Sequence, residues 1–280
     1  MRRLARPLMA LLGVHPTSAN RRRTAELRRE LGGKGRNVGG RTSVFGWDIE
    51  YVDALSMLSS LEVLVVDGWN DFETTTNRPL ILDCGANIGI SVLNYKRRHP
   101  NARIIAFEPD PQIAPMLRRN LERNGAADTE VVEAAAWISD GEVRWFSEGA
   151  DGSRIVANGD SAPTVSRVRS VDLRRFLEQP IDLLKIDVEG SEYELVAHIA
   201  PCLGTVDQLI VECHVMSSNV AQFGSLLTIL TDRGFQIAVN SLGPRRDLVH
   251  RPATVPFGFD QYFVVAGWRR NAEPPSGLPA

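Results

Sequence analysis

Two hydrophobic patterns alternate along the chain from residue 80 onward. Short apolar runs predict strands, and longer segments with apolar residues three or four positions apart predict helices. We expect strands at 80–82, 102–107, 130–137, 142–146, 181–186, 208–213, 235–239 and 261–266. We expect helices at 88–98, 111–124, 171–177, 191–199 and 223–233. Strands that alternate with helices of about ten residues are typical of a mostly parallel, doubly wound α/β sheet.

Glycine and turn signals divide this pattern into segments. Asp140-Gly141 predicts a tight hairpin turn that joins 134–138 to 142–146. Five glycines lie close together just before residue 41, where the pattern of a folded domain begins. We therefore expect a basic N-terminal extension at 1–40, an N-terminal cap segment at 41–79, a main domain at 80–270 and a flexible tail at 271–280.

Composition narrows the class of protein. The chain has 280 residues, of which 43% are hydrophobic, so most of it can form a buried core rather than a disordered chain. We find no apolar stretch near the roughly 20 residues that a bilayer-spanning helix needs. Three scattered cysteines form neither a disulfide framework nor a CxxC zinc motif, which favours a reducing compartment. We expect a cytoplasmic protein.

The small net charge of −2 hides an uneven distribution. Residues 1–40 hold ten Lys or Arg against two Glu, a net charge of +8, which leaves −10 for the remainder. Such a segment suits an anionic membrane surface or a nucleic acid. We favour a solubilising, partly helical extension, expect no nucleic-acid partner, and keep peripheral membrane contact through residues 1–40 as an alternative.

The first predicted strand of the main domain ends in a ligand-binding type of loop, Asp83 to Gly89. Gly85 and Gly89 allow tight turns, and Asn87 is one of the few other residues that tolerates the left-handed conformation. The loop does not match GxGxxG, so a dinucleotide site is disfavoured. Asp83, at the carboxyl end of its strand, suits an ammonium group better than a phosphate.

The second strand ends in Glu108-Pro109-Asp110. Glu108 follows Asp83 at close to the spacing of about 20 residues expected of an acid that accepts hydrogen bonds from ribose hydroxyls. The loop and the acid together predict a ligand that contains adenosine.

Six segments resemble the FkbM-type methyltransferases, a branch of the S-adenosylmethionine-dependent Rossmann-like enzymes. They are ILDCGANIGIS at 81–91, IIAFEPDP at 104–111, EAAAW at 133–137, VRSVDL at 168–173, LLKIDVEGSEYELV at 183–196 and LIVECHV at 209–215. The resemblance implies a Rossmann-like class I methyltransferase fold with an antiparallel C-terminal strand. It also implies S-adenosylmethionine as cofactor. The implied cofactor contacts are Asp83, Gly85, Ala86, Asn87, Gly89, Glu108 and Pro109, with Ala135 and Ala136 near the adenine.

Polar residues at two later strand ends supply candidate catalytic groups. Alternation places Lys185 and Asp187 on one side of their strand, and Glu212 and His214 share a face of the next. Asp187 or His214 can act as a general base. Asp187, Glu189, Glu212 and His214 can instead hold a divalent cation, and Lys185 can orient an acceptor or pair with an acid. We favour the base over the metal and leave metal dependence open.

The resemblance also implies transfer to a hydroxyl group, so we expect an O-methyltransferase that acts on a hydroxyl of a sugar, glycolipid or secondary metabolite. The acceptor is expected to be a small molecule or a glycan. A nicotinamide-dependent oxidoreductase is a weaker alternative because GxGxxG is missing. A catalytically silent binding module that uses residues 1–40 is the alternative from another class.

Overall fold

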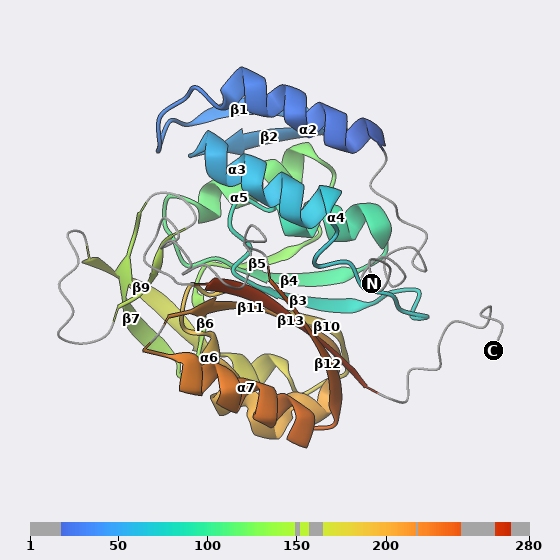
Figure 1. Ribbon diagram of the computed structural model, residues 1–280, viewed down its shortest axis with the longest axis vertical. Coiled ribbons are helices and arrows are strands. Elements are labelled where there is room, and N and C mark those ends of the chain that lie inside the picture. Colours follow the sequence, from blue (N-terminus) through green and yellow to red (C-terminus); the bar gives the residue numbers. More distant parts are fainter. Residues whose placement is uncertain (1–17, 149–151, 157–164, 217, 242–260, 270–280) are drawn as a thin grey trace, which may run out of the picture.

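The computed structural model describes residues 18–148, 152–156, 165–216, 218–241 and 261–269. Its centre is a seven-stranded sheet with the strand order β12, β13, β11, β10, β3, β4, β5 (Figure 1). The strands are β3 Leu80–Cys84, β4 Arg103–Phe107, β5 Glu130–Val132, β10 Ile181–Ile186, β11 Val206–Val215, β12 Phe235–Ser241 and β13 Gln261–Arg269. The five from β11 to β5 are parallel, and β13 is antiparallel to both neighbours. The doubly wound sheet with an antiparallel C-terminal strand is thus confirmed.

Both faces of this sheet are covered by helices. Side chains such as Ile81 and Leu183 contribute to one core, and their sequence neighbours Leu82 and Leu184 contribute to the other. The first core packs under α4 (Ile90–Arg98) and α5 (Ala114–Arg123), and the second under α6 (Glu192–Ile199) and α7 (Val220–Asp232). Because both faces are buried, the central strands are continuous apolar runs, which made them readable from the sequence.

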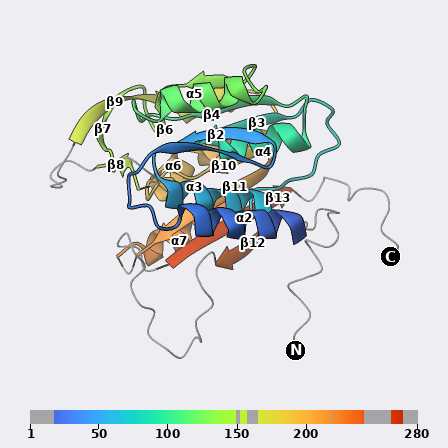
Figure 2. The same ribbon diagram turned by 90° about the horizontal axis from the view of Figure 1, so that it is seen from above.

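An N-terminal layer lies over α4 and α5 (Figures 1 and 2). It consists of α2 (Ser18–Leu31), β1 (Gly40–Val44), β2 (Trp47–Tyr51), α3 (Ala54–Ser60) and the π-helix η1 (Leu61–Val66). The layer shares the first hydrophobic core, in which the Leu27 side chain of α2 is fully buried. The described part of the basic segment is therefore a helix that packs on the domain, with Arg21 paired to Asp67 and Arg28 to Glu62.

Two asparagines of α5 hold this layer in place. The side-chain amide of Asn120 accepts from the Glu50 N–H at 2.8 Å and donates to the Glu50 carbonyl at 2.9 Å. Asn124, which caps the helix, makes the same pair of bonds with Asp48 at 2.8 and 3.0 Å. The two side chains thus hydrogen-bond to the backbone N–H and C=O groups on the outer edge of β2, as a neighbouring strand would. Asn120 also donates to the carbonyl of Ile88, at 2.9 Å, in the loop after β3.

The predicted hairpin around Asp140-Gly141 is wrong. A second sheet has the order β6, β9, β7, β8, with β6 at Ala135–Trp137, β7 at Gly141–Phe146, β8 at Arg154–Ile155 and β9 at Val165–Asp172. β9 lies between β6 and β7, parallel to the former and antiparallel to the latter. Gly141 does have a positive φ of 139°, so the chain turns there. The strands on the two sides of this turn, β6 and β7, pair with β9 and not with each other.

Two other predicted elements are corrected. The strand expected at 130–137 divides into β5 and β6, which belong to different sheets. The helix expected at 171–177 is the end of β9 followed by the short 3₁₀ helix η2, Leu173–Phe176. Asp172 caps η2 by accepting from the Arg174 N–H, which ends the strand and starts the turn. A 3₁₀ turn, η3 (Ala200–Thr205), follows α6.

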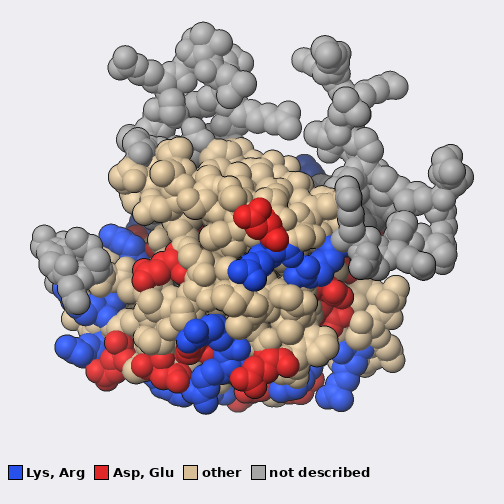
Figure 3. All heavy atoms as spheres, turned by 90° about the horizontal axis from the view of Figure 1, so that it is seen from below, with Lys and Arg blue, Asp and Glu red and all other residues tan. Residues whose placement is uncertain are grey.

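Figure 3 shows the face that carries α6 and α7. The exposed residues of α7 are mostly uncharged, among them Gln222, Ser225 and Thr228, and charged side chains occupy other parts of this face. Within the described ranges, no helix has both the length and the apolar composition needed to cross a membrane.

We predict that α2 contributes to the stability of the domain. Leu27→Ala should lower the free energy of unfolding by about 2–5 kcal/mol, because it leaves a cavity in a closed core. Arg22→Ala on the same helix is the matched control, since the Arg22 side chain is 83% exposed, and should change it by about 0.5 kcal/mol or less. Urea unfolding measures the free energy of unfolding of both variants. Equal values for the two variants would show that the packing of α2 does not stabilise the domain.

Candidate active site

A pocket opens at the carboxyl ends of β3, β4, β10 and β11, where the strand order reverses between β3 and β10. This is the position at which doubly wound sheets bind ligands. Every predicted site residue lines it except Asp83 and Gly89. The lining members are Gly85, Ala86, Asn87, Glu108, Pro109, Ala135, Ala136, Lys185, Asp187, Glu212 and His214.

The loop after β3 has the backbone geometry that the sequence predicted. Gly85, Asn87 and Gly89 all have positive φ angles, of 89°, 48° and 94°. A Cβ on Gly85 would lie 1.9 Å from the carbonyl oxygen of Asp187, and one on Gly89 would lie 2.7 Å from Leu117 Cδ1. Gly89 therefore allows the loop to pack closely against Leu117 of α5, whereas Gly85 allows the loops after β3 and β10 to touch.

Glu108 lines the pocket at the end of β4. Its carboxylate accepts backbone N–H groups from Asn87 and Asp110, both at 2.9 Å. Burial raises the pKa of Glu108 to about 7, although these two N–H donors oppose the shift. The backbone contacts fix the orientation of the carboxylate and leave lone pairs for hydroxyl groups of a ligand.

Lys185 is buried beneath the loop and has three partners. Its ammonium lies 3.1 Å from Asp83 Oδ1 and 3.2 Å from Asp187 Oδ2, and it donates to the Gly85 carbonyl at 2.6 Å. Burial alone would lower its pKa, but the carboxylates of Asp83 and Asp187 outweigh burial and raise it. Of the two roles predicted for Lys185, the structure shows pairing with acids.

Asp83 lies behind the pocket rather than in its wall. The side chain is fully buried, and it accepts from the Ser91 hydroxyl at 2.5 Å in addition to its pairing with Lys185. Its contact with a cofactor thus stays a prediction. In the structure Asp83 joins the start of α4 to the ammonium that supports the loop.

His214 is held between two carboxylates. Its Nδ1 lies 2.8 Å from Glu192 and its Nε2 lies 3.1 Å from Glu189. Burial lowers its pKa, but Glu192 and Glu189 have the larger combined effect and raise it well above the ordinary value. Both ring nitrogens of His214 thus have carboxylate partners, and its role as general base stays a prediction.

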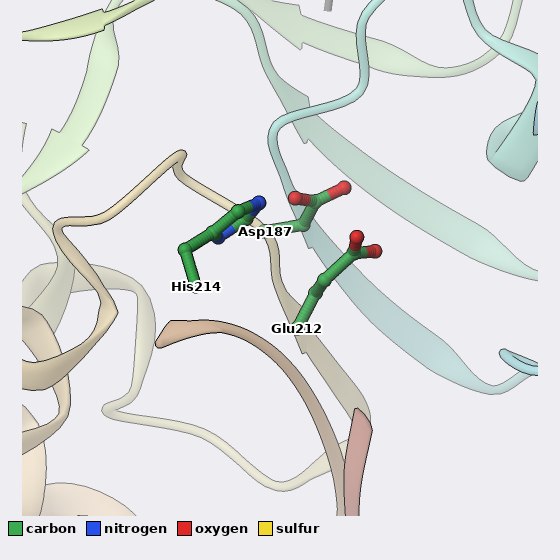
Figure 4. Close-up of side chains that lie close together, drawn as sticks. All are labelled: Asp187, Glu212 and His214. Atoms are coloured by element: carbon green, nitrogen blue, oxygen red, sulfur yellow. The ribbon is translucent and has the colours of Figure 1, made fainter. Parts of the chain in front are cut away.

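Glu212 faces the pocket beside Asp187 and His214 (Figure 4). Within the described part of the chain, its carboxylate makes no hydrogen bond or ion pair, in contrast to the carboxylates of Asp187 and Glu189. Burial, followed by repulsion from Asp187, raises the pKa of Glu212 to about 8. A carboxylate with such a pKa is suited to accept a proton near neutral pH.

Asp187, Glu212 and His214 each offer a donor atom within 4.8 Å of the others. This spacing could hold a metal ion. Its imidazole ligand, however, would have to leave one of the two carboxylates that His214 already contacts, and metal ligation requires a neutral imidazole.

Several lining residues escaped the sequence analysis. Asp110 anchors β7 and the segment after it, because it accepts from Trp145 Nε1 at 3.2 Å and from the Ser147 hydroxyl at 2.7 Å. Its position two residues after Glu108 was the available signal. The N-terminal layer also contributes Ser59, Ser60, Val63 and Leu64 to the wall. Their contribution depends on how α3 and η1 pack over the sheet, which no local pattern reveals.

The strand order, the loop after β3 and the acid after β4 define the Rossmann-like class I methyltransferase fold. Residues 83–237 match the Methyltransferase FkbM domain. The chain therefore belongs to the FkbM methyltransferase family and is a methyltransferase.

Known relatives agree with this family. The chain is 23% identical over 233 residues to Methyltransferase 1 of Beauveria bassiana, covering 74% of this chain and 88% of that protein. It is 28% identical over 138 residues to the 2-O-methyltransferase NoeI of Sinorhizobium fredii, covering 42% and 56% of the two chains. Among solved structures, TYW2 of M. jannaschii in complex with AdoMet aligns with a TM-score of 0.48 at 10% identity, covering 85% of this chain and 89% of that one.

We predict that Asp83 is needed for folding. Asp83→Asn should lower the free energy of unfolding by about 3–5 kcal/mol, because Lys185 would remain buried with one carboxylate fewer. Asp140→Asn is the control, since Asp140 and its partner Arg175 are more than half exposed and such pairs contribute about 1 kcal/mol or less. The check is chemical denaturation of both variants; similar losses would contradict the central role of the Asp83–Lys185 pair.

Proposed function

We propose that the protein transfers a methyl group from S-adenosylmethionine to a hydroxyl group of a sugar, glycolipid or secondary metabolite. The observation that carries this proposal is one pocket with two chemically different ends. A backbone loop and an oriented carboxylate, Glu108, lie at one end, and Glu212, whose carboxylate has no partner among the described residues, lies at the other.

The cofactor end suits an adenosine moiety. The Glu108 carboxylate can accept both hydroxyls of one ribose, and Ala135 and Ala136 offer a small apolar surface for a base. When bound, S-adenosylmethionine supplies a methyl group on a sulfonium, which is already electrophilic. The work left to the protein is to align an acceptor, exclude water and remove the hydroxyl proton.

The acceptor end suits removal of that proton by Glu212. Asp187 is engaged with Lys185, and His214 is held between Glu189 and Glu192. Glu212 is the remaining predicted catalytic residue whose carboxylate faces the pocket without a partner among the described residues. In this proposal the hydroxyl oxygen gains the methyl group, and its proton moves to a Glu212 oxygen. The name of the relative NoeI, a 2-O-methyltransferase, supports oxygen as the acceptor atom.

The central experiment joins binding and turnover. Calorimetry should show that S-adenosylhomocysteine binds and that NAD does not, and labelled S-adenosylmethionine should transfer its methyl group to a component of the host's glycan and lipid extracts. Binding of NAD in place of S-adenosylhomocysteine would overturn the proposal in favour of an oxidoreductase.

Glu212→Gln should bind S-adenosylhomocysteine as the wild type does and lose turnover by about 10²–10⁴-fold, the usual contribution of a general base. Glu194→Gln is the matched control, because Glu194 is exposed on α6, and should keep full turnover. Assays with and without EDTA separate a metal role from a proton-transfer role. A fully active Glu212→Gln enzyme would remove Glu212 from the mechanism.

Adenosine binding should depend on pH through Glu108. Since the pKa of Glu108 is raised to about 7, the carboxyl is largely protonated below that pH and accepts hydroxyl groups less well. Affinity for adenosine should therefore rise as pH increases from 6 to 8. Adenosine is the sharper probe because it has no amino-acid group that titrates in this range. In Glu108→Gln the affinity should be lower at pH 8 and independent of pH; an unchanged pH profile in the variant would contradict the assignment.

Location in the cytoplasm and contact with a membrane surface stay predictions. The membrane contact concerns residues 1–40, of which 1–17 lie outside the described residues. Sedimentation with anionic and with neutral vesicles tests the membrane contact.

A further inference from the structure

The acceptor end of the pocket is unusually rich in carboxylates. Asp187, Glu189 and Glu212 line it, and Glu192 lies fully buried behind them. Asp83 is also buried close by, under Lys185. Five carboxyl groups thus converge on the ends of β3, β10 and β11.

The positive groups nearby are already neutralised. The Lys185 ammonium is shared between Asp83 and Asp187, and the His214 ring is shared between Glu189 and Glu192. Among the described residues that line the pocket there is no arginine. Among these described residues, an anionic group on an acceptor would therefore meet carboxylates and no free cationic partner, and burying an unpaired charge is strongly unfavourable.

The same wall offers many hydrogen-bond acceptors. Carboxylate oxygens accept hydroxyl protons well, and the pocket lining also includes the hydroxyls of Ser59 and Ser60, which can donate or accept. Tyr262 lies against His214 with ring centroids 5.1 Å apart, and the apolar side chains of Val63 and Leu64 also line the pocket. This mixture of acceptor oxygens and apolar surface matches a molecule with several hydroxyls on a carbon ring.

The geometry points to an uncharged polyhydroxyl acceptor, such as a neutral sugar, and to selection against acceptors that carry a carboxylate, phosphate or sulfate next to the methylated hydroxyl. This inference rests on the proposed function, and it adds the charge class of the substrate.

The test uses two glycosides that differ in one charged group, methyl α-D-glucopyranoside and methyl α-D-glucuronopyranoside. Each is titrated at pH 8.5 into the full-length protein saturated with S-adenosylhomocysteine, with binding followed by ligand-observed NMR. We expect the neutral glycoside to bind at least about tenfold more tightly, a difference of about 1.4 kcal/mol. Equal binding, tighter binding of the glucuronide, or binding of neither glycoside would overturn the inference.

A variant identifies the source of the selectivity. Glu189→Gln removes one negative charge while Glu192 still holds His214, so the preference for the neutral glycoside should fall several-fold. Glu194→Gln, exposed on α6, removes the same charge outside the pocket and should leave the preference unchanged. An equal effect of the two variants would show that net charge, and not the pocket, controls the preference.

The S-adenosylhomocysteine titration separates this inference from the proposed function. Failure to bind S-adenosylhomocysteine contradicts the proposed function itself. Normal S-adenosylhomocysteine binding with equal affinity for the two glycosides contradicts only the charge selection.

Discussion

The buried ammonium of Lys185 is the interaction on which the site depends. It joins the carboxylates at the ends of β3 and β10 and donates to the carbonyl of Gly85. An ammonium this deeply buried is stable only because two carboxylates compensate its desolvation, and those carboxylates can lie so close to each other only because the ammonium lies between them. The loop after β3 and the residue after β10 thus share one electrostatic support.

A second shared charge has a similar effect on the next strand. His214 bridges Glu189 and Glu192, so the loop after β10 and the start of α6 are tied to the end of β11. In these two clusters Asp187, Lys185 and His214 are all engaged in ion pairs. Glu212 faces the pocket and has no such pair among the described residues, so the four neighbouring polar side chains have different surroundings.

The sequence predicted the parts of the fold and site that depend on local chemistry. The central strands were readable because both of their faces are buried, and the left-handed turns at Gly85 and Asn87 follow from which residues tolerate a positive φ. Glu108 was found from its spacing to Asp83. Prediction failed where long-range contacts decide. Asp140-Gly141 marks a turn whichever strands flank it, and nothing near His214 shows that Glu189 and Glu192 converge on it. Ser59 and Ser60 reach the pocket only through the packing of α3.

The amides of Asn120 and Asn124 have a consequence beyond holding the N-terminal layer. An open strand edge presents unpaired N–H and C=O groups that can pair with a strand of another molecule. Along the side of β2 that faces α5, the backbone groups of Asp48 and Glu50 are already occupied by the two amides, while β1 occupies the other side. The β2 edge of this two-stranded ribbon, which would otherwise be a template for aggregation, is thereby closed by a helix, without a third strand.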